Sequence, residues 1–227
     1  FIRSNEEKKY VKELSFLKET QVFLRGNVWQ VPYILRALTS SLPLLMASYE
    51  HRQMKQALVR EIRNHQYDLI HIEPFYVYPS LPLLSVPLVV VEHNIEYMVY
   101  GAYADQFFLP LLRPFFRWDI DKLRTQEQYI WKQAKKIITV SGGDKEEIIK
   151  TVGKDQVMVV ENGVDVKMFT YNTKSFAKKE KTIVFVGNYN WVPNVQAVTL
   201  LLSTYWPLLK KTFSDMQLIV VGKDLPS

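Results

Sequence analysis

The sequence predicts an α/β fold with parallel sheets, and three of its features carry this prediction. Several short segments are continuous apolar runs, such as "VPLVVVE" at residues 86–92, which is typical of strands buried on both faces. Helical patterns separate most of these runs, as crossover connections between parallel strands require. Polar residues follow the runs directly, and ligands of open parallel sheets bind at those carboxyl ends.

Helices are expected where apolar residues recur at helical spacing. Asn5 can cap the first helix, and Pro43 introduces the second, because proline is favoured at the first helical position. Asn194, directly after Pro193, can cap the last. The expected helices cover residues 5–18, 42–66 and 116–136, with a fourth starting at Asn194.

The strands and a change of composition predict the domain organisation. The expected strands cover residues 20–26, 67–73, 86–94, 134–141, 157–163, 182–187 and 216–222. Between Gly163 and Lys181 the chain becomes polar and basic, and a fresh strand–helix–strand pattern follows. We therefore expect a first domain at residues 1–165, a linker at 166–180 and a second domain at 181–227.

Composition narrows the classes of function. The 227 residues include no cysteine, which excludes disulfides and thiolate chemistry, and the four histidines show no metal-binding spacing. We expect no metal and no cofactor. The 29 basic and 23 acidic side chains favour anionic partners such as nucleotides, phosphates, nucleic acid or an acidic membrane face. No apolar run reaches the roughly 18 residues needed to span a bilayer.

The segment "EHNIEY" places His93 and Asn94 at a strand end, flanked by carboxylates. A histidine there can bond a sugar hydroxyl or relay a proton, or it can simply close the strand against a neighbouring loop. Glu73 ends the preceding strand, and Glu96 follows closely on His93. His71 lies inside a strand and is interpreted as a core histidine.

The stretch "FVGNYNWVPNVQAV" carries the second candidate site. Gly187 follows a strand, so main chain can approach a ligand closely, and the amides of the helix starting near Asn194 attract anions. With Asn188, these residues form a candidate diphosphate cradle. The same features suit any strand-to-helix loop, and neither the dinucleotide fingerprint nor the phosphate-loop motif is present.

Two further patterns, a D-x-D motif and an aromatic segment, each have a functional and a structural interpretation. Asp119 and Asp121 form a D-x-D on an expected helix, where residues two apart face different ways, so we reject a metal site. Residues 98–118 mix aromatic side chains, leucines and two arginines. Exposed, such a segment contacts a membrane surface; folded inward, it is ordinary core.

In combination, the motifs resemble those of glycosyltransferase family 4, whose GT-B fold has two Rossmann-like domains. The resemblance extends from about Tyr67 to Gly222, and the last motif is similar to a variant found in one bacterial branch of the family. The motifs are "YDLIHIE", "VPLVVVEHNIEY", "AKKIITVSGGDKEEI", "VMVVENGVDVKMF" and "IVFVGNYNWVPNVQAVTLLL".

The resemblance implies roles for the candidate residues. His93 matches the strand-end histidine that faces the donor sugar, and Asn94 follows it. Gly187 and Asn188 match the loop beneath the donor diphosphate, and Asn194 stays a donor-binding candidate from its place at the helix start. Glu73 and Glu96 become acceptor-side candidates, and the first domain is expected to hold the acceptor and the second the nucleotide-sugar.

The sequence also departs from the family pattern. Many members place an arginine and a lysine in the donor loop, where this chain has Asn188 and, within one residue, Pro193. The family's glutamate pair would fall beyond residue 227 and its glycine-rich acceptor-side loop before Phe1. We therefore expect a fragment lacking both ends, with the second domain only partly present.

The resemblance implies a retaining, metal-independent glycosyltransferase of hexosyltransferase type. It would move a sugar from a nucleotide-sugar to a saccharide or lipid-linked saccharide in polysaccharide biosynthesis. We expect a bacterial, cytoplasmic protein with peripheral membrane contact and no nucleic-acid partner. Two alternatives remain open: a non-catalytic basic module binding nucleic acid or anionic lipid, and a GT-B sugar-nucleotide epimerase.

Overall fold

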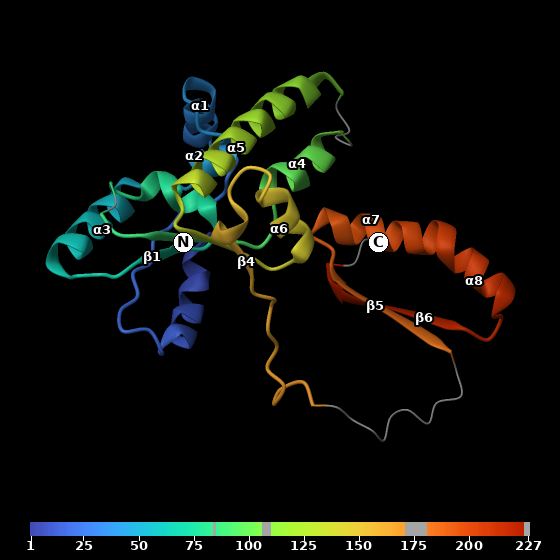
Figure 1. The fold of residues 1–227 in the computed structure, drawn as a ribbon. Helices are drawn as coiled ribbons and strands as arrows, with labels where there is room; N and C mark the ends of the chain where they lie inside the picture. Colours follow the sequence, from blue (N-terminus) through green and yellow to red (C-terminus); the bar gives the residue numbers. More distant parts are fainter. Residues whose placement is uncertain (84, 106–109, 171–180, 225–227) are drawn as a thin grey trace. The chain divides into compact units, whose positions relative to one another are not determined.

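A computed structural model describes residues 1–83, 85–105, 110–170 and 181–224 of the chain (Figure 1). The chain divides into two compact units, Phe1–Gly163 and Val164–Ser227, and each is described separately. Each unit contains a parallel sheet with helices, so the predicted α/β class is confirmed. Most of the linker expected at 166–180 lies outside the described residues.

The sheet of unit 1 has the strand order β1-β2-β3-β4, and every neighbouring pair is parallel. Its strands are β1 (Ile70–Ile72), β2 (Leu88–Glu92), β3 (Lys136–Thr139) and β4 (Val157–Val159). The register pairs Ile72 with Val90 and Glu92 with Thr139. Because all four strands run the same way, the residues that follow them meet at one edge of the sheet.

Helical segments connect and cover these strands. They are η1 (Asn5–Leu14), α1 (Val31–Thr39), α2 (Leu44–Ala47), α3 (Arg52–Asn64), η2 (Phe75–Ser80), α4 (Glu96–Asp105), η3 (Pro110–Leu112), α5 (Arg113–Gln133), α6 (Gly142–Ile148) and η4 (Lys154–Gln156), where η marks 3-10 helix. The long helix α5 matches the one expected at 116–136. Figure 1 shows α6 beside β4.

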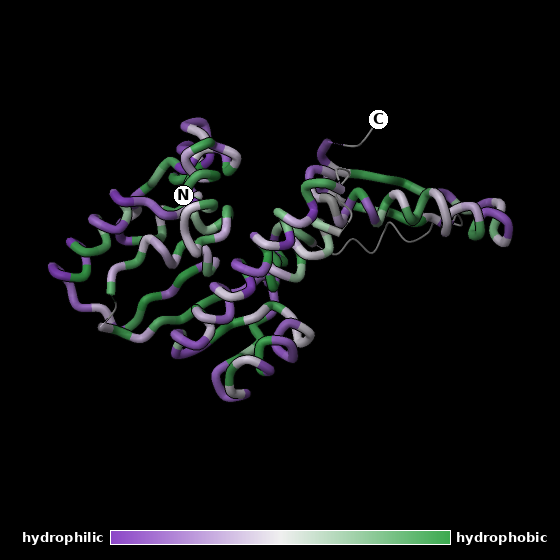
Figure 2. Tube along the Cα trace, turned by 90° about the horizontal axis from the view of Figure 1, so that it is seen from above, coloured by the Kyte–Doolittle hydropathy of each residue, from purple (hydrophilic) through white to green (hydrophobic). Residues whose placement is uncertain are grey.

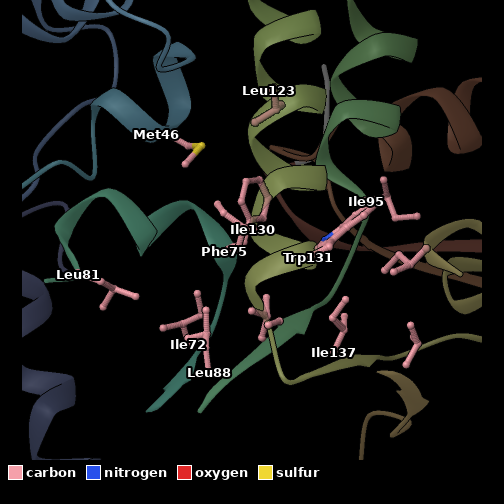
Figure 3. Packing of buried hydrophobic residues seen from close by; sticks show 14 residues of the cluster. Met46, Ile72, Phe75, Leu81, Leu88, Ile95, Leu123, Ile130, Trp131 and Ile137 are labelled. Atoms are coloured by element: carbon pink, nitrogen blue, oxygen red, sulfur yellow. The ribbon is translucent and has the colours of Figure 1, made fainter. Parts of the chain in front are cut away.

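The core of unit 1 forms where α5 lies on the sheet. Residues Leu123, Ile130 and Trp131 are buried on one stripe of α5, and Figure 3 shows them on the same helix. They join strand residues such as Val90 and Ile137, both fully buried, in a single hydrophobic cluster. Strand β2 thus has no exposed position, as the sequence predicts for a strand buried on both faces, whereas β1, β3 and β4 each have one exposed position.

The long helix expected at 42–66 is broken into α2 and α3. Ser80 of η2 accepts a hydrogen bond from the amide of His51 at 2.7 Å and donates one to the carbonyl of Tyr49 at 2.5 Å. These bonds occupy backbone groups that a continuous helix would use itself. The ring of His51 then caps α3 by accepting from the amide of Met54 at 3.3 Å.

The N-terminal predictions are also partly wrong. The helix expected at 5–18 is the 3-10 helix η1, its cap position is Ser4 rather than Asn5, and none of its residues is buried. The strand expected at 20–26 is reduced to one bridge between Ile2 and Leu24. Without a buried face, the apolar stripe of this segment has nothing to anchor a regular α-helix.

Unit 2 has two parallel strands, β5 (Thr182–Asn188) and β6 (Gln217–Lys223). They are joined by a helical run of α7 (Val192–Leu200), the π-helix η6 (Leu201–Tyr205) and α8 (Trp206–Thr212). Figure 2 shows mainly hydrophobic residues along these strands. Burial alternates along both strands, with Val184 and Val186 exposed, whereas the sequence predicts burial on both faces.

Among the residues that the structure describes, no helix is long and apolar enough to cross a bilayer.

Candidate active site

The carboxyl edge of the unit 1 sheet brings Glu73 and His93 together. Glu73 follows β1 and His93 follows β2, and these strands are parallel neighbours. The Nε2 of His93 lies 2.5 Å from Oε1 of Glu73. Nε2 of His71 lies 3.8 Å from the other carboxylate oxygen, Oε2. All three side chains are about half exposed, so a ligand can reach them.

His71 therefore differs from its prediction as a core histidine. It occupies the middle of β1, but its side chain is 49% exposed, and its nearest charged group is Glu73. It pairs in register with Val89 of β2. The three-residue strand β1 lies at the edge of the sheet, and its burial alternates, so the middle position faces outward.

Asn94 and Glu96 flank this pair on the loop that leads into α4. Asn94 is exposed, whereas Glu96 is partly buried at the first position of the helix. Burial raises the pKa of the Glu96 carboxyl to about 7, although the nearby His93 works in the opposite direction. A carboxyl group that titrates near neutrality can both donate and accept a proton at a working site.

Two fully buried carboxyl groups lie beneath the loop. Glu92, the last residue of β2, accepts a hydrogen bond at Oε1 from the indole N–H of Trp131 at 2.8 Å. Its other oxygen, Oε2, has no partner among the described residues. Glu127 of α5 accepts from the amides of Glu96 at 2.9 Å and Tyr97 at 3.1 Å.

Burial raises the pKa of both carboxyl groups. The negative charge of Glu127 raises the pKa of Glu92 further, and the Trp131 bond only partly offsets this. At Glu127, the two bonds from backbone amides act against burial and limit the rise of the pKa. Glu92 is therefore the member of the pair that keeps its proton as the pair titrates.

In unit 2 the side chains of the loop from Gly187 to Asn194 form hydrogen bonds within the loop itself. Asn194 does not cap α7: the cap position is Trp191, and the Asn194 side chain donates to the carbonyl of Asn188 at 3.0 Å. Oδ1 of Asn188 accepts from the amide of Asn190 at 3.1 Å. A Cβ on Gly187 would lie 3.3 Å from Asn194, so the glycine serves this packing.

The start of α7 offers fewer anion-binding amides than the sequence predicts. Pro193 has no N–H, and the amides of Asn194 and Val195 both donate to the carbonyl of Trp191. The free amides of a helix N-terminus are what attract a phosphate. The geometry of this loop by itself therefore gives the diphosphate interpretation less support than the sequence did.

Gly222 is a constraint in unit 2 that the sequence did not reveal. Its φ is +155°, and an added Cβ would lie 1.7 Å from the carbonyl oxygen of its register partner, Gly187. We expect Gly222→Ala to destabilise unit 2 by about 1–3 kcal/mol from backbone strain alone. Urea denaturation measures this. Gly153→Ala is the control, because a Cβ there meets no atom within 4 Å; equal losses would contradict the prediction.

Within the D-x-D motif, Asp119 has a structural role. Asp119 accepts from the amide of Leu44 at the start of α2 and lies 3.5 Å from Lys122, while Asp121 is exposed. Residues 106–109 of the aromatic segment 98–118 lie outside the described residues. A surface hollow of about 560 Å³ borders Leu88 and Lys135, at the amino ends of β2 and β3 and away from His93.

The comparison with known families decides the class of protein. The family model described as Glycosyltransferase Family 4 matches residues 20–168, which is more than half of the chain. The chain belongs to glycosyltransferase family 4. No curated protein matches the chain.

The candidate site of unit 1 lies within the residues of this family 4 chain that the family model matches. Glu73, His93, Asn94 and Glu96 all fall between residues 20 and 168, whereas the loop from Gly187 to Asn194 lies outside that range. As a member of the family the chain is a glycosyltransferase in general terms, acting on a sugar donor and an acceptor. The candidate active site is therefore the one on unit 1.

Sequence reasoning missed the buried pair, Glu92 and Glu127, beneath the candidate site. The sequence pattern around each of the two glutamates indicates its burial. Glu127 falls on the same helical stripe as Leu123, Ile130 and Trp131, all of which are buried. Glu92 ends an apolar strand instead of following it. A glutamate at a core position needs hydrogen-bond partners that are themselves buried. Its presence in the sequence therefore indicates a buried cluster of polar groups.

Proposed function

We propose that this protein is a retaining glycosyltransferase. It transfers a hexose from a nucleotide-sugar to a hydroxyl group of a saccharide or lipid-linked saccharide, in polysaccharide biosynthesis in the bacterial cytoplasm. No metal ion takes part. Unit 1 holds the acceptor, and unit 2 holds the nucleotide-sugar. The observation that carries the proposal is the pairing of Glu73 and His93 within the range matched by the family 4 model.

The side chains at this edge suit the recognition of sugar hydroxyls. A carboxylate accepts hydrogen bonds from hydroxyl groups, and a histidine held by it presents its ring in a fixed orientation. In the proposed mechanism His93 and Asn94 contact the donor sugar, while Glu73 and Glu96 bind the acceptor. The acceptor oxygen bonds to the anomeric carbon on the face from which the nucleoside diphosphate leaves, and the hydroxyl proton passes to the departing diphosphate.

The donor loop contributes through its main chain. We propose that Gly187, Asn188 and Asn194 line the diphosphate, with Asn194 acting as a brace for the loop and not as a helix cap. Its bond to the carbonyl of Asn188 supports that role. With few free amides at the start of α7, stabilisation of the leaving group depends on additional groups that contact the phosphates.

Thermal stabilisation by sugar nucleotides tests the proposal. We expect one of a panel of uridine, guanosine and adenosine diphosphate sugars to raise the Tm selectively, because a ligand that binds only the native state stabilises it. Stabilisation by short DNA and any polyanion alike would instead indicate the basic binding module. A change in the donor sugar without an acceptor would reveal an epimerase.

We also propose that unit 1 contacts an anionic membrane. On α1 the exposed side chains of Val31, Leu35 and Leu38 recur at helical spacing and form an apolar stripe. The ring of Trp29, just before α1, meets that of Phe116 at 6.4 Å, which joins this stripe to the start of α5. Exposed apolar patches bordered by basic helices are typical of proteins that bind membrane surfaces.

Sedimentation with vesicles tests this contact. We expect the protein to bind anionic vesicles more strongly than neutral ones, because its net charge is +6. Leu35→Asp should weaken vesicle binding by about tenfold or more, the effect of losing one buried leucine. Gln53→Asp, at an exposed position on α3, is the control for the added charge. Equal recovery with both vesicle types would contradict the proposal.

A further inference from the structure

The helix that follows the candidate site is preceded by a residue whose side chain cannot cap it. α4 begins at Glu96, directly after the segment that carries His93 and Asn94. The residue before it, Ile95, has an aliphatic side chain that cannot accept a hydrogen bond. The first amides of a helix have no partner within the helix, so they need an acceptor from elsewhere.

Glu127 supplies that acceptor from α5. Its Oε1 accepts from the amide of Glu96 at 2.9 Å, and its Oε2 accepts from the amide of Tyr97 at 3.1 Å. The Glu127 side chain is fully buried and comes from more than 30 residues along the chain, counted from Glu96. A buried carboxyl group bonded to the first two helix amides is a strong, water-excluded cap.

The same helix also holds the other end of the site segment. Trp131, one turn after Glu127 on α5, donates to Oε1 of Glu92 at 2.8 Å. Trp131 and Glu92 are both fully buried. The five-residue segment from Glu92 to Glu96 is therefore tied to α5 at both ends, and His93 lies between the two ties.

We propose that Glu127 is a positioning residue for the candidate site: by holding the start of α4 it fixes the loop from which His93 reaches Glu73. The tie at Glu92 fixes one end of the loop, but the direction of the chain after His93 depends on where α4 begins. The proposal about geometry stands on these contacts, and only its effect on sugar transfer rests on the proposed function.

The neighbouring carboxyl group suits this role. Glu92 has an unpartnered oxygen among the described residues and retains its proton more strongly, so the pair avoids two adjacent negative charges. Both oxygens of Glu127 then serve as acceptors for the two amides. Glutamine at position 92 imitates the protonated acid, whereas glutamine at 127 turns an N–H₂ group toward an amide that needs an acceptor.

The test compares E127Q with E92Q in the full chain, using amide hydrogen exchange and the ¹⁵N ring signals of His93. In E127Q we expect the amides of Glu96 and Tyr97 to exchange about fivefold faster or more, as for the loss of a helix cap. The ring signals of His93 should shift, because its bond to Glu73 loosens. In E92Q the exchange of both amides should remain as in the wild type.

Two outcomes would overturn the proposal. Unchanged exchange in E127Q would show that Glu127 does not hold α4, and faster exchange with unchanged His93 signals would show that it is only a helix cap. If circular dichroism shows that E127Q does not fold, E127D gives the same readouts, because it keeps the carboxyl group on a side chain one methylene shorter.

Activity separates this proposal from the proposed function. With the nucleotide-sugar that stabilises the protein, we expect E127Q to lower kcat about tenfold with little change in KM, the effect of a misplaced reacting group. If no sugar nucleotide binds the wild type, the proposed function fails, while the exchange rates and the His93 signals still decide whether Glu127 positions His93.

Discussion

Replacing His93 by alanine is expected to lower the rate of sugar transfer by about 10²–10⁴-fold, the range seen for positioned acid and base groups. The Tm should hardly change, because the His93 side chain is 44% exposed and contributes little to the core. Transfer is measured as release of nucleoside diphosphate from the sugar nucleotide that stabilises the protein.

The expected loss follows from the geometry of the strand ends. His93 Nε2 is 2.5 Å from Glu73 Oε1, so the ring is held by a carboxylate and is not a freely rotating surface group. Alanine removes the ring and leaves Glu73 without this partner, while the backbone of β2 is unchanged. An effect on turnover with an unchanged Tm would therefore locate the role of His93 at the substrate.

His65→Ala is the matched control for this experiment. His65 is also exposed and also lies beside a glutamate, with its Nδ1 2.9 Å from Oε1 of Glu61, but it follows α3 and not a strand end. The control should transfer sugar at the wild-type rate. Full activity in His93→Ala, or an equal loss in His65→Ala, would remove the assignment of His93 to the site.

The sequence predicts the individual strand ends better than their assembly. Continuous apolar runs identify the strands of unit 1, and the parallel class places Glu73 and His93 on one edge. Their direct contact depends on the register of β1 against β2, which composition does not specify. The resemblance to the family implies roles for these residues, but it does not predict that Glu73 and His93 are in contact.

Other features depend on partners that are distant in the sequence. The break at Tyr49 and His51 results from Ser80, and the cap of α4 comes from Glu127, more than 30 residues away. Local patterns treat a helix as self-contained, so they predict a continuous helix in the first case and give no sign of the distant cap in the second. The helix cap predicted at Asn194 is wrong for a similar reason, because its side chain donates a hydrogen bond to the carbonyl of Asn188.

The buried carboxyl groups predict that stability falls as the pH rises. The folded-state pKa of Glu92 is raised well above 4.5, and that of Glu96 is raised to about 7. In the unfolded chain both groups titrate near their ordinary value. Above about pH 4.5 the native state therefore holds more protons than the unfolded state, which is the condition under which the free energy of unfolding decreases with pH.

The decrease should begin near pH 4.5 and continue through neutrality. Each extra proton held by the native state contributes a slope of about 1.4 kcal/mol per pH unit. The groups that act on Glu92 are Glu127, Glu96 and Asp144, which raise its pKa, and Trp131, which lowers it. Because Glu92 and Glu127 are coupled, the pair contributes as a unit and not as two independent acids.

Urea denaturation between about pH 5 and 8, in the wild type and in E92Q, isolates this contribution. Glutamine is neutral throughout, so the slope in E92Q should be shallower by the share that the pair contributes, while all other titrating groups cancel in the difference. Identical slopes in the two proteins would mean that Glu92 is ionised in the native state. Its orphaned oxygen would then need a donor, which the described residues do not supply.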